Sequence, residues 1–168
     1  MSATVDGSGA LSGPDPVVRQ MTMDDLPAVM KIERTTFPAD AWSESMMRGE
    51  LNDQPRTRYY VVACVGDAIV GYGGLAAAAD QADIQTIAVL AGHRRSGIGA
   101  ALMDALLAEA ARRDTEAVFL EVRSDNEPAQ AMYERFGFER LGVRRRYYED
   151  GTDAITMVKK LDGRGDGA

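Results

Sequence analysis

The feature that most constrains the fold is a strand-like run followed at once by a basic, glycine-containing turn and a helical segment, at residues 87–102. The strand part begins Ile87-Ala88-Val89, and the turn reads Arg94-Arg95-Ser96-Gly97-Ile98-Gly99-Ala100. Glycines let the backbone approach an anion closely, and the first N–H groups of a helix attract negative charge. Arginines add charge-assisted hydrogen bonds. The segment therefore predicts a strand–turn–helix unit whose turn binds a pyrophosphate.

Two other glycine-rich phosphate loops do not fit these residues. A dinucleotide-binding fingerprint requires a third glycine where this chain has Leu102. A Walker loop requires Lys followed by Ser or Thr after its last glycine, where this chain has Ala100-Ala101. The alternative without a ligand is a tight strand-to-helix turn shaped by the glycines alone. The two neighbouring arginines favour the anion site.

Composition narrows the class of protein. A chain of 168 residues, 45% hydrophobic and 27% charged, is typical of one globular domain with a substantial core. The chain has no run of about 18 apolar residues and no signal-peptide pattern, so we expect a cytoplasmic location and no membrane partner. The net charge of −7 argues against direct nucleic-acid binding and favours a basic partner, although ordinary solubility explains it equally well.

The single cysteine and the single histidine exclude two kinds of chemistry. Cys64 has no partner for an internal disulfide, and its apolar neighbours predict a buried strand residue rather than a nucleophile. His93 stands without a Cys/His cluster, so we expect no metal and place this histidine in the phosphate turn.

The order of patterns along the chain predicts an α/β fold. Residues 1–15 and 162–168 are small and polar and are expected to be a disordered leader and tail around one domain, 16–161. Strands are expected at 17–21, 57–65, 68–75, 83–90, 117–122, 138–147 and 154–161, and helices at 24–34, after Ser43, at 97–113 and at 128–136. Because Pro27 is tolerated only in a first turn, Asp24 is expected as the first N-cap rather than Thr22. The result is a mixed central β-sheet flanked by helices on both faces.

Two motifs resemble those of the GNAT acetyltransferase family. Arg94-x-x-Gly97-x-Gly99 is similar to the family's coenzyme A motif, Gln/Arg-x-x-Gly-x-Gly/Ala. The segment 121–138 resembles its Glu-Val-Arg-x-x-Asn…Tyr-x-x-x-Gly-Phe block, in the form of the RimI-type subgroup, which acetylates the N-terminal alanine of a small-subunit ribosomal protein. The resemblance covers about residues 17–161 and implies the GNAT fold with acetyl-CoA as co-substrate. The acetyl-CoA-binding residues that it implies are Ile87, Ala88, Val89, Arg94, Arg95, Ser96, Gly97, Ile98, Gly99, Ala100, Asn126 and Tyr133.

The resemblance also implies catalytic roles. Amide formation from a thioester needs an unprotonated amine, donors for the developing oxyanion and a proton for the departing thiolate. By analogy with the subgroup, Glu121 is the general base, Tyr133 is the general acid and Asn126 holds the pantetheine arm, while backbone N–H groups of residues 87–89 stabilise the oxyanion. Taken alone, these three side chains would be a solvated strand carboxylate, a packed helix residue and a helix N-cap.

Two further segments resemble the substrate loops of the same subgroup. They are Phe37-Pro38…Trp42-Ser43 and Tyr147-Tyr148…Asp153-Ala154…Met157. The resemblance implies that the acceptor contacts Phe37, Trp42, Tyr147, Tyr148 and Asp153. Five carboxylates in or beside these segments are expected to attract a basic N-terminal peptide, such as that of a ribosomal protein: Asp40, Glu44, Glu149, Asp150 and Asp153. The alternatives are acetylation of lysine side chains or of small amines such as polyamines or aminoglycosides, and a non-catalytic acyl-CoA sensor.

Overall fold

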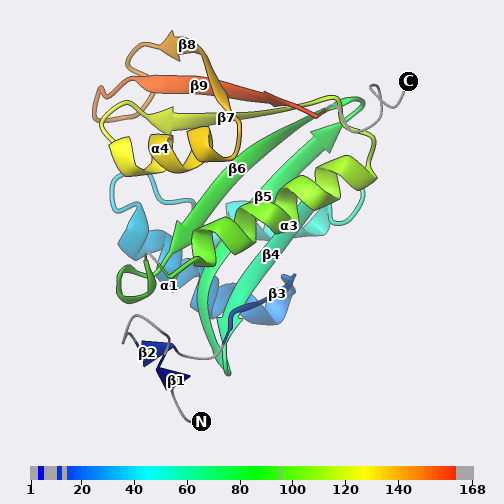
Figure 1. Ribbon diagram of the computed structural model, residues 1–168, viewed down its shortest axis with the longest axis vertical. Coiled ribbons are helices and arrows are strands. Elements are labelled where there is room, and N and C mark those ends of the chain that lie inside the picture. Colours follow the sequence, from blue (N-terminus) through cyan, green and yellow to red (C-terminus); the bar gives the residue numbers. More distant parts are fainter. Residues whose placement is uncertain (1–3, 6–10, 13–14, 95, 162–168) are drawn as a thin grey trace.

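A computed structural model describes residues 4–5, 11–12, 15–94 and 96–161, and its centre is a seven-stranded sheet (Figure 1). The strands stand in the order β3-β4-β5-β6-β7-β9-β8, and each neighbouring pair is antiparallel except β6 and β7. Their bounds are β3 Val17–Gln20, β4 Arg58–Val65, β5 Ala68–Ala78, β6 Gln81–Val89, β7 Ala117–Arg123, β8 Glu139–Arg144 and β9 Ala154–Lys160.

Helices cover both faces of this sheet, as predicted. In Figure 1, α3 and α4 lie in front of the sheet, and α1 and α2 lie behind it. The helices are α1 Leu26–Thr36, α2 Glu44–Asn52, α3 Ile98–Arg112 and α4 Glu127–Arg135, with short 3-10 turns η1 Met23–Asp25 and η2 Ala91–His93. Helix α3 is the crossover between the parallel strands β6 and β7.

The alternation of side chains along the strands divides the core into two clusters, one on each face. On β4, Val61 and Ala63 belong to the cluster that α3 covers, whereas Tyr60 and Val62 belong to the cluster that α1 and α2 cover. This is the two-residue period of a strand that is buried on both faces. The stripe predicted for α3 is buried in the first cluster: Ile98, Leu102, Leu106 and Ala110.

The predicted N-cap of the first helix, Asp24, is wrong. Thr22 precedes η1, and Asp25 stands at the junction with α1, whose first turn holds Pro27 as expected. The carboxylate of Asp25 accepts a hydrogen bond from the backbone N–H of Thr22 at 2.8 Å and two from the guanidinium of Arg19 at 2.8 Å each. The bonds from Arg19 lower the pKa of Asp25. Thr22 and Asp25 thus form a local capping box that the sequence prediction overlooked, and Arg19 of β3 adds a tertiary contact to it.

Several strand ends also differ from the predictions. β5 and β6 pair as far as Ala78 and Gln81, so their hairpin is longer than its weak β-propensity suggested. β8 ends at Arg144, because Arg146 has a positive φ of 54° and begins a loop. Cys64 lies on β4 as predicted but is half-buried.

The two ends of the chain fall largely outside the description. Residues 162–168 are not among the described residues, and of 1–15 the structure describes residue 15 and a short antiparallel pair, Thr4–Val5 with Leu11–Ser12. No helix in the described part of the chain is long and apolar enough to cross a membrane.

The feature that positions the site is the divergence of β6 from β7. Their parallel ladder runs from Gln81–Ala117 to Ile84–Leu120, whereas both strands continue beyond it. Gln85 is the extra residue of a β-bulge, since Gly74 pairs with Thr86 and Leu75 pairs with Ile84. Beyond Ile84, β6 is paired with β5, and beyond Leu120, β7 is paired with β9. The facing backbone edges of the two strands are thereby released from the ladder.

Candidate active site

The phosphate turn has the predicted strand–turn–helix geometry. Gly97 precedes α3 with a φ of 84°, a left-handed conformation that glycine adopts without strain. The first intrahelical bond runs from the N–H of Ala101 to the carbonyl of Gly97 at 2.9 Å, so the N–H groups of Ile98, Gly99 and Ala100 have no acceptor within the helix. These donors, at the positive end of a 15-residue helix, fit an anionic group.

Side chains around the turn hold its shape. The Nε of Arg94 donates to the carbonyl of Val89 at 3.0 Å, and the hydroxyl of Ser96 donates to the carbonyl of His93. Arg94 thus ties the turn to the end of β6, while its side chain is exposed. His93, which we expected in the phosphate turn, is the last residue of η2 immediately before Arg94, and Arg95 lies outside the described residues.

Glu121 lies on the sheet face opposite α3. Its neighbours Leu120 and Val122 are buried in the cluster beneath α3, so the alternation of β7 directs Glu121 to the other side. The carboxylate accepts a hydrogen bond from the Thr156 hydroxyl at 3.2 Å and lies 3.5 Å from Nε of Arg144. With its side chain 28% exposed, it is a held, accessible carboxylate rather than a freely solvated one.

Tyr133 lies on the α3 side of the sheet. It belongs to α4 and packs against the cluster that α3 covers, with its ring edge-to-face to Phe138 at a centroid distance of 6.1 Å. Burial, and next the nearby Tyr148, raise the pKa of Tyr133 to about 12. The hydroxyl is therefore protonated throughout the neutral range. Packing and proton donation are compatible at this position.

The two predicted catalytic side chains are thus on opposite faces of the sheet, near the divergence of β6 and β7. Glu121 is the first residue of β7 beyond the ladder, and α4, which carries Tyr133, follows β7 directly. A Cβ added to Gly99 would lie 3.3 Å from Sδ of Met132, so α4 also touches the first turn of α3. The structure therefore gathers the phosphate turn, the two free strand edges and both predicted catalytic residues in one region.

The remaining predicted coenzyme A residues flank the same divergence. Ile87, Ala88 and Val89 pair with Gly73, Tyr72 and Gly71 of β5 through one edge of β6, and the other edge faces β7 beyond the ladder. Asn126 is the N-cap of α4, with its side chain accepting from the N–H of Ala129 at 3.2 Å. The cap that we had considered as an alternative role is confirmed, and the side-chain amide group still has donors to offer.

Sequence reasoning missed Arg123, which joins the two predicted substrate loops. Its guanidinium donates to Asp40 of the first loop at 3.0 Å and to Asp150 and Thr152 of the second loop, the latter at 2.9 Å. It also lies 4.8 Å from the ring centre of Tyr148. The loops are 83 and 27 residues from Arg123 along the chain, so no local pattern could have indicated this contact.

These contacts involve most of the carboxylates that we expected at the entrance. Asp40 and Asp150 are paired with Arg123, Glu44 is paired with Arg48, and the carboxylate of Asp153 accepts from the N–H of Arg146. The hydrogen bond from Arg123 lowers the pKa of Asp150 to about 2. Three of the five carboxylates that we expected to attract a basic peptide are therefore paired with arginines, and because Asp40 and Asp150 share one arginine, their negative charge is only partly offset.

The aromatic residues of the second loop form one unit. Tyr147 and Tyr148 stand edge-to-face at 5.1 Å, with Tyr147 49% exposed. Burial raises the pKa of Tyr148 to about 12. The backbone carbonyl of Asp153 accepts from the N–H of Ser124 at 2.9 Å, which ties this loop to the end of β7. Asp153 thus shapes the loop through both its side chain and its backbone.

The first predicted substrate loop is anchored by a buried carboxylate. Glu33 of α1 is 3% exposed and accepts hydrogen bonds from the Tyr72 hydroxyl and, at 2.9 Å, from the backbone N–H of Trp42. Burial raises the pKa of Glu33. Phe37 and Trp42 both pack against the cluster beneath α1 and α2. The sequence could have indicated this buried role, because Glu33 lies on the apolar stripe of its helix.

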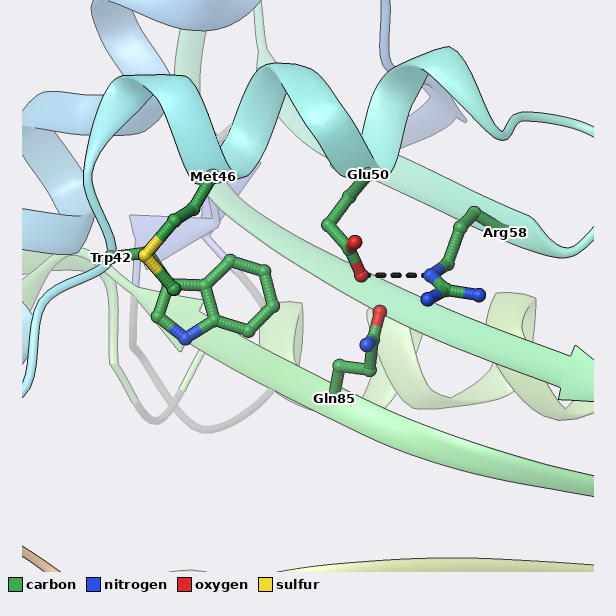
Figure 2. Close-up of a pocket in the computed structure, with 5 residues that line it drawn as sticks. All are labelled: Trp42, Met46, Glu50, Arg58 and Gln85. Carbon is green, nitrogen blue, oxygen red and sulfur yellow. Dashed lines mark hydrogen bonds and ion pairs between the residues drawn. The ribbon is translucent and has the colours of Figure 1, made fainter.

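A pocket opens beside Trp42, on the face of the sheet that Glu121 occupies. Figure 2 shows it between α2 and the strands, lined by Trp42, Met46, Glu50, Arg58 and Gln85. Its volume is about 320 Å³. Of its lining residues, only Trp42 was predicted to contact substrate. Elsewhere in the described part of the chain, no group of three or more His, Cys, Asp or Glu side chains is arranged to hold a metal ion.

Comparison with known proteins places this architecture in a family. The family model "Acetyltransferase (GNAT) family" matches residues 26–138. The chain is 33% identical, over 83% of its length and 92% of the relative, to a protein of Bacillus subtilis named as a putative ribosomal protein bS18-alanine N-acetyltransferase. It is 36% identical, over 82% of its length and 87% of the relative, to an N-alpha-acetyltransferase RimI of Mycobacterium tuberculosis.

A solved structure agrees with these sequence relatives. The crystal structure of the ribosomal-protein-alanine N-acetyltransferase of Escherichia coli superimposes with a TM-score of 0.79 at 30% identity, covering 88% of this chain and 94% of that one. The fold, the motif positions and the relatives lead to one conclusion. The chain is an acetyltransferase and belongs to the GNAT family.

Proposed function

We propose that the protein transfers an acetyl group from acetyl-CoA to the α-amine of an N-terminal alanine, with a small-subunit ribosomal protein as the acceptor. The observation that carries the proposal is the placement of Glu121 and Tyr133 on opposite faces of the sheet where β6 and β7 diverge. The names of the relatives support the acceptor class. Direct attack in a ternary complex fits this arrangement, because base and acid each face one side of the reacting carbonyl.

Each residue then has a definite task. The first N–H groups of α3 and the arginine of the turn hold the pyrophosphate, and the free edges of β6 and β7 hold the pantetheine arm with Asn126. Acetyl-CoA supplies the activated acyl group as a thioester. Glu121 removes a proton from an α-ammonium group whose ordinary pKa is about 7.7–8.0, so a weak base suffices. Backbone N–H groups of residues 87–89 stabilise the oxyanion. As the C–S bond breaks, Tyr133 gives its proton to the departing sulfur, and the second proton of the amine nitrogen restores the tyrosine hydroxyl.

Acetyl-CoA should stabilise the protein, and Arg94 should contribute to that effect. At a hundredfold excess over Kd, linkage gives about 2.7 kcal/mol of added stability, measurable as a rise in Tm. Arg94→Gln removes a charge-assisted hydrogen bond worth about 1.5–3 kcal/mol, so the affinity should fall roughly 10- to 100-fold. Arg112→Gln, at the far end of α3, is the matched control. An equal Tm rise in wild type and Arg94→Gln would remove Arg94 from the binding site.

The acceptor class is tested with three amines at low and high salt. They are a peptide beginning Ala-Arg, the same peptide with a blocked N-terminus and an added lysine, and spermidine. We expect clear preference for the free α-amine and a dependence on salt that is reduced but not abolished, because Asp40 and Asp150 share the single positive charge of Arg123. Preference for the blocked peptide or for spermidine would overturn the N-terminal proposal in favour of lysine or small-amine acetylation.

A further inference from the structure

The pocket in Figure 2 begins beside the predicted base. The last pair of the parallel ladder is Ile84–Leu120, so Gln85 and Glu121 are the next residues on their two strands. Glu121 points away from the α3 cluster, because Leu120 and Val122 on either side of it are buried there, and Gln85 does so because it bonds to Tyr60 of the opposite cluster. Gln85 lines the pocket, and its amide oxygen accepts from the Tyr60 hydroxyl at 2.6 Å. The pocket therefore lies one strand away from Glu121 on the same face.

This separation is on the scale of one residue of an acceptor chain. Paired strands are about 4.8 Å apart, and Gln85 and Glu121 stand one residue beyond the last pair of the ladder, where the strands begin to separate. Consecutive Cα atoms of the acceptor are about 3.8 Å apart. When the α-amine of the first residue is at Glu121, the side chain of the next residue comes within reach of a pocket that starts at Gln85. The first residue itself is held at the divergence of β6 and β7.

The chemistry of the lining suits a long cationic side chain. Trp42 and Met46 supply apolar surface, and Figure 2 shows the indole ring and the methionine sulfur at one end with the Glu50 and Arg58 side chains at the other. The Nε of Arg58 donates to Glu50 at 2.7 Å, with side chains 25% and 19% exposed. Lysine and arginine place their stems on such apolar surface, stack on tryptophan and direct their charge to a carboxylate.

The charge around the pocket is negative on balance. Glu50 and Arg58 offset each other, and Asp83 adds a second carboxylate two residues before Gln85, on the same face of β6. Register places Asp83 and Arg58 in one row across the sheet, since both pair with Ala76. Partial desolvation and then the charge of Glu121 raise the pKa of Asp83, whereas Arg144 and Arg58 oppose this change.

The walls of the pocket are held in place before any peptide binds. The backbone of Trp42 is fixed by buried Glu33, and the Ser43 side chain caps α2 by accepting from the N–H of Met46 at 3.1 Å. The Tyr60 hydroxyl fixes the side chain of Gln85 by donating a hydrogen bond to its amide oxygen. A pre-formed pocket loses little conformational entropy when a peptide binds, so the interaction of its charges with the peptide side chain contributes directly to selectivity.

We propose that this pocket receives the side chain of the second residue of the acceptor peptide and selects arginine or lysine there. The inference rests on N-terminal acetylation as the proposed function. It adds which residue of the acceptor is recognised and which side chains of the protein recognise it. Glu50 and Trp42 are the specificity-determining side chains, and Arg58 limits the preference by competing for Glu50.

The test compares kcat/KM for peptides that differ only at the second residue: Ala-Arg, Ala-Gln and Ala-Glu. In the wild type we expect the order Arg, Gln, Glu. Glu50→Gln should reduce the Arg-to-Gln ratio by about three- to fivefold, the effect of one partly buried charge pair, and Arg58→Gln should increase it. General loosening of the pocket would change the Arg-to-Gln ratio in the same direction in both variants, so opposite changes in this ratio identify a charge effect. Glu44→Gln, on the same helix and also paired with an arginine, is the control and should leave the ratio unchanged.

Binding is measured without turnover through the fluorescence of Trp42, the single tryptophan of the chain. With CoA in place of acetyl-CoA, the Ala-Arg peptide should change the emission, and the Ala-Glu peptide should change it much less. Equal kcat/KM for the three peptides, selectivity at the third residue instead of the second, or an effect of Glu44→Gln equal to that of Glu50→Gln would overturn the pocket assignment alone. A wild-type enzyme that acetylates none of these peptides would overturn the proposed function, and the pocket assignment with it.

Discussion

Replacing Glu121 by Gln should lower turnover at neutral pH by about 10²–10⁴-fold, the range for losing a positioned general base. The substitution keeps the size of the side chain and its contact with Thr156 while removing the group that accepts the proton. The affinity for acetyl-CoA should hardly change, because Glu121 lies on the face opposite α3 and the phosphate turn. Stopped assays of peptide acetylation and the acetyl-CoA-dependent Tm shift measure the two quantities separately.

The pH dependence of this variant is informative. An α-amine has a pKa of about 7.7–8.0, so an amine that must lose its proton without a base should react faster as the pH rises toward 9. The residual rate of Glu121→Gln should therefore increase with pH more steeply than that of the wild type. Glu139→Gln, an exposed strand carboxylate on β8, is the control. A near-normal rate at neutral pH would mean that another group, or a chain of water molecules, serves as the base.

Replacing Tyr133 by Phe should lower turnover by about 10²-fold, because thiolate departure loses its proton donor. Tyr59→Phe, another ring packed against the same cluster, controls for the loss of a hydroxyl as such. Burial raises the pKa of Tyr133 to about 12, so the wild type should show no loss of this acid between pH 7 and pH 10. The raised pKa favours the neutral hydroxyl, and only ionisation near pH 12 would remove the proton.

The two variants should also respond differently to the leaving group. An acetyl thioester of a more acidic thiol needs less protonation as it departs, so it should restore much of the rate of Tyr133→Phe and little of that of Glu121→Gln. If the better leaving group fails to help Tyr133→Phe, the tyrosine acts by packing the helix rather than by proton donation.

The sequence by itself determined the elements whose causes are local. A β-branched run, a glycine with left-handed geometry at position 97 and an apolar stripe on 98–112 specify the strand, turn and helix that form the phosphate turn. Alternation along β7 already separates Glu121 from its buried neighbours, because a strand has a period of two residues. Family motifs carried the predicted roles of Glu121 and Tyr133, since chemistry at a site depends on residue types at fixed spacing.

Tertiary structure alone decided which distant side chains meet. Asp40 and Asp150 were expected to face a cationic substrate, but Arg123 reaches both across 83 and 27 residues and uses their charge to hold two loops together. Glu33 holds Trp42, and Glu50, Arg58 and Gln85 form one pocket, although they come from a helix and two strands. Charge and hydrogen bonding act between neighbours in space, so their outcome follows from how the strands pair and the helices pack.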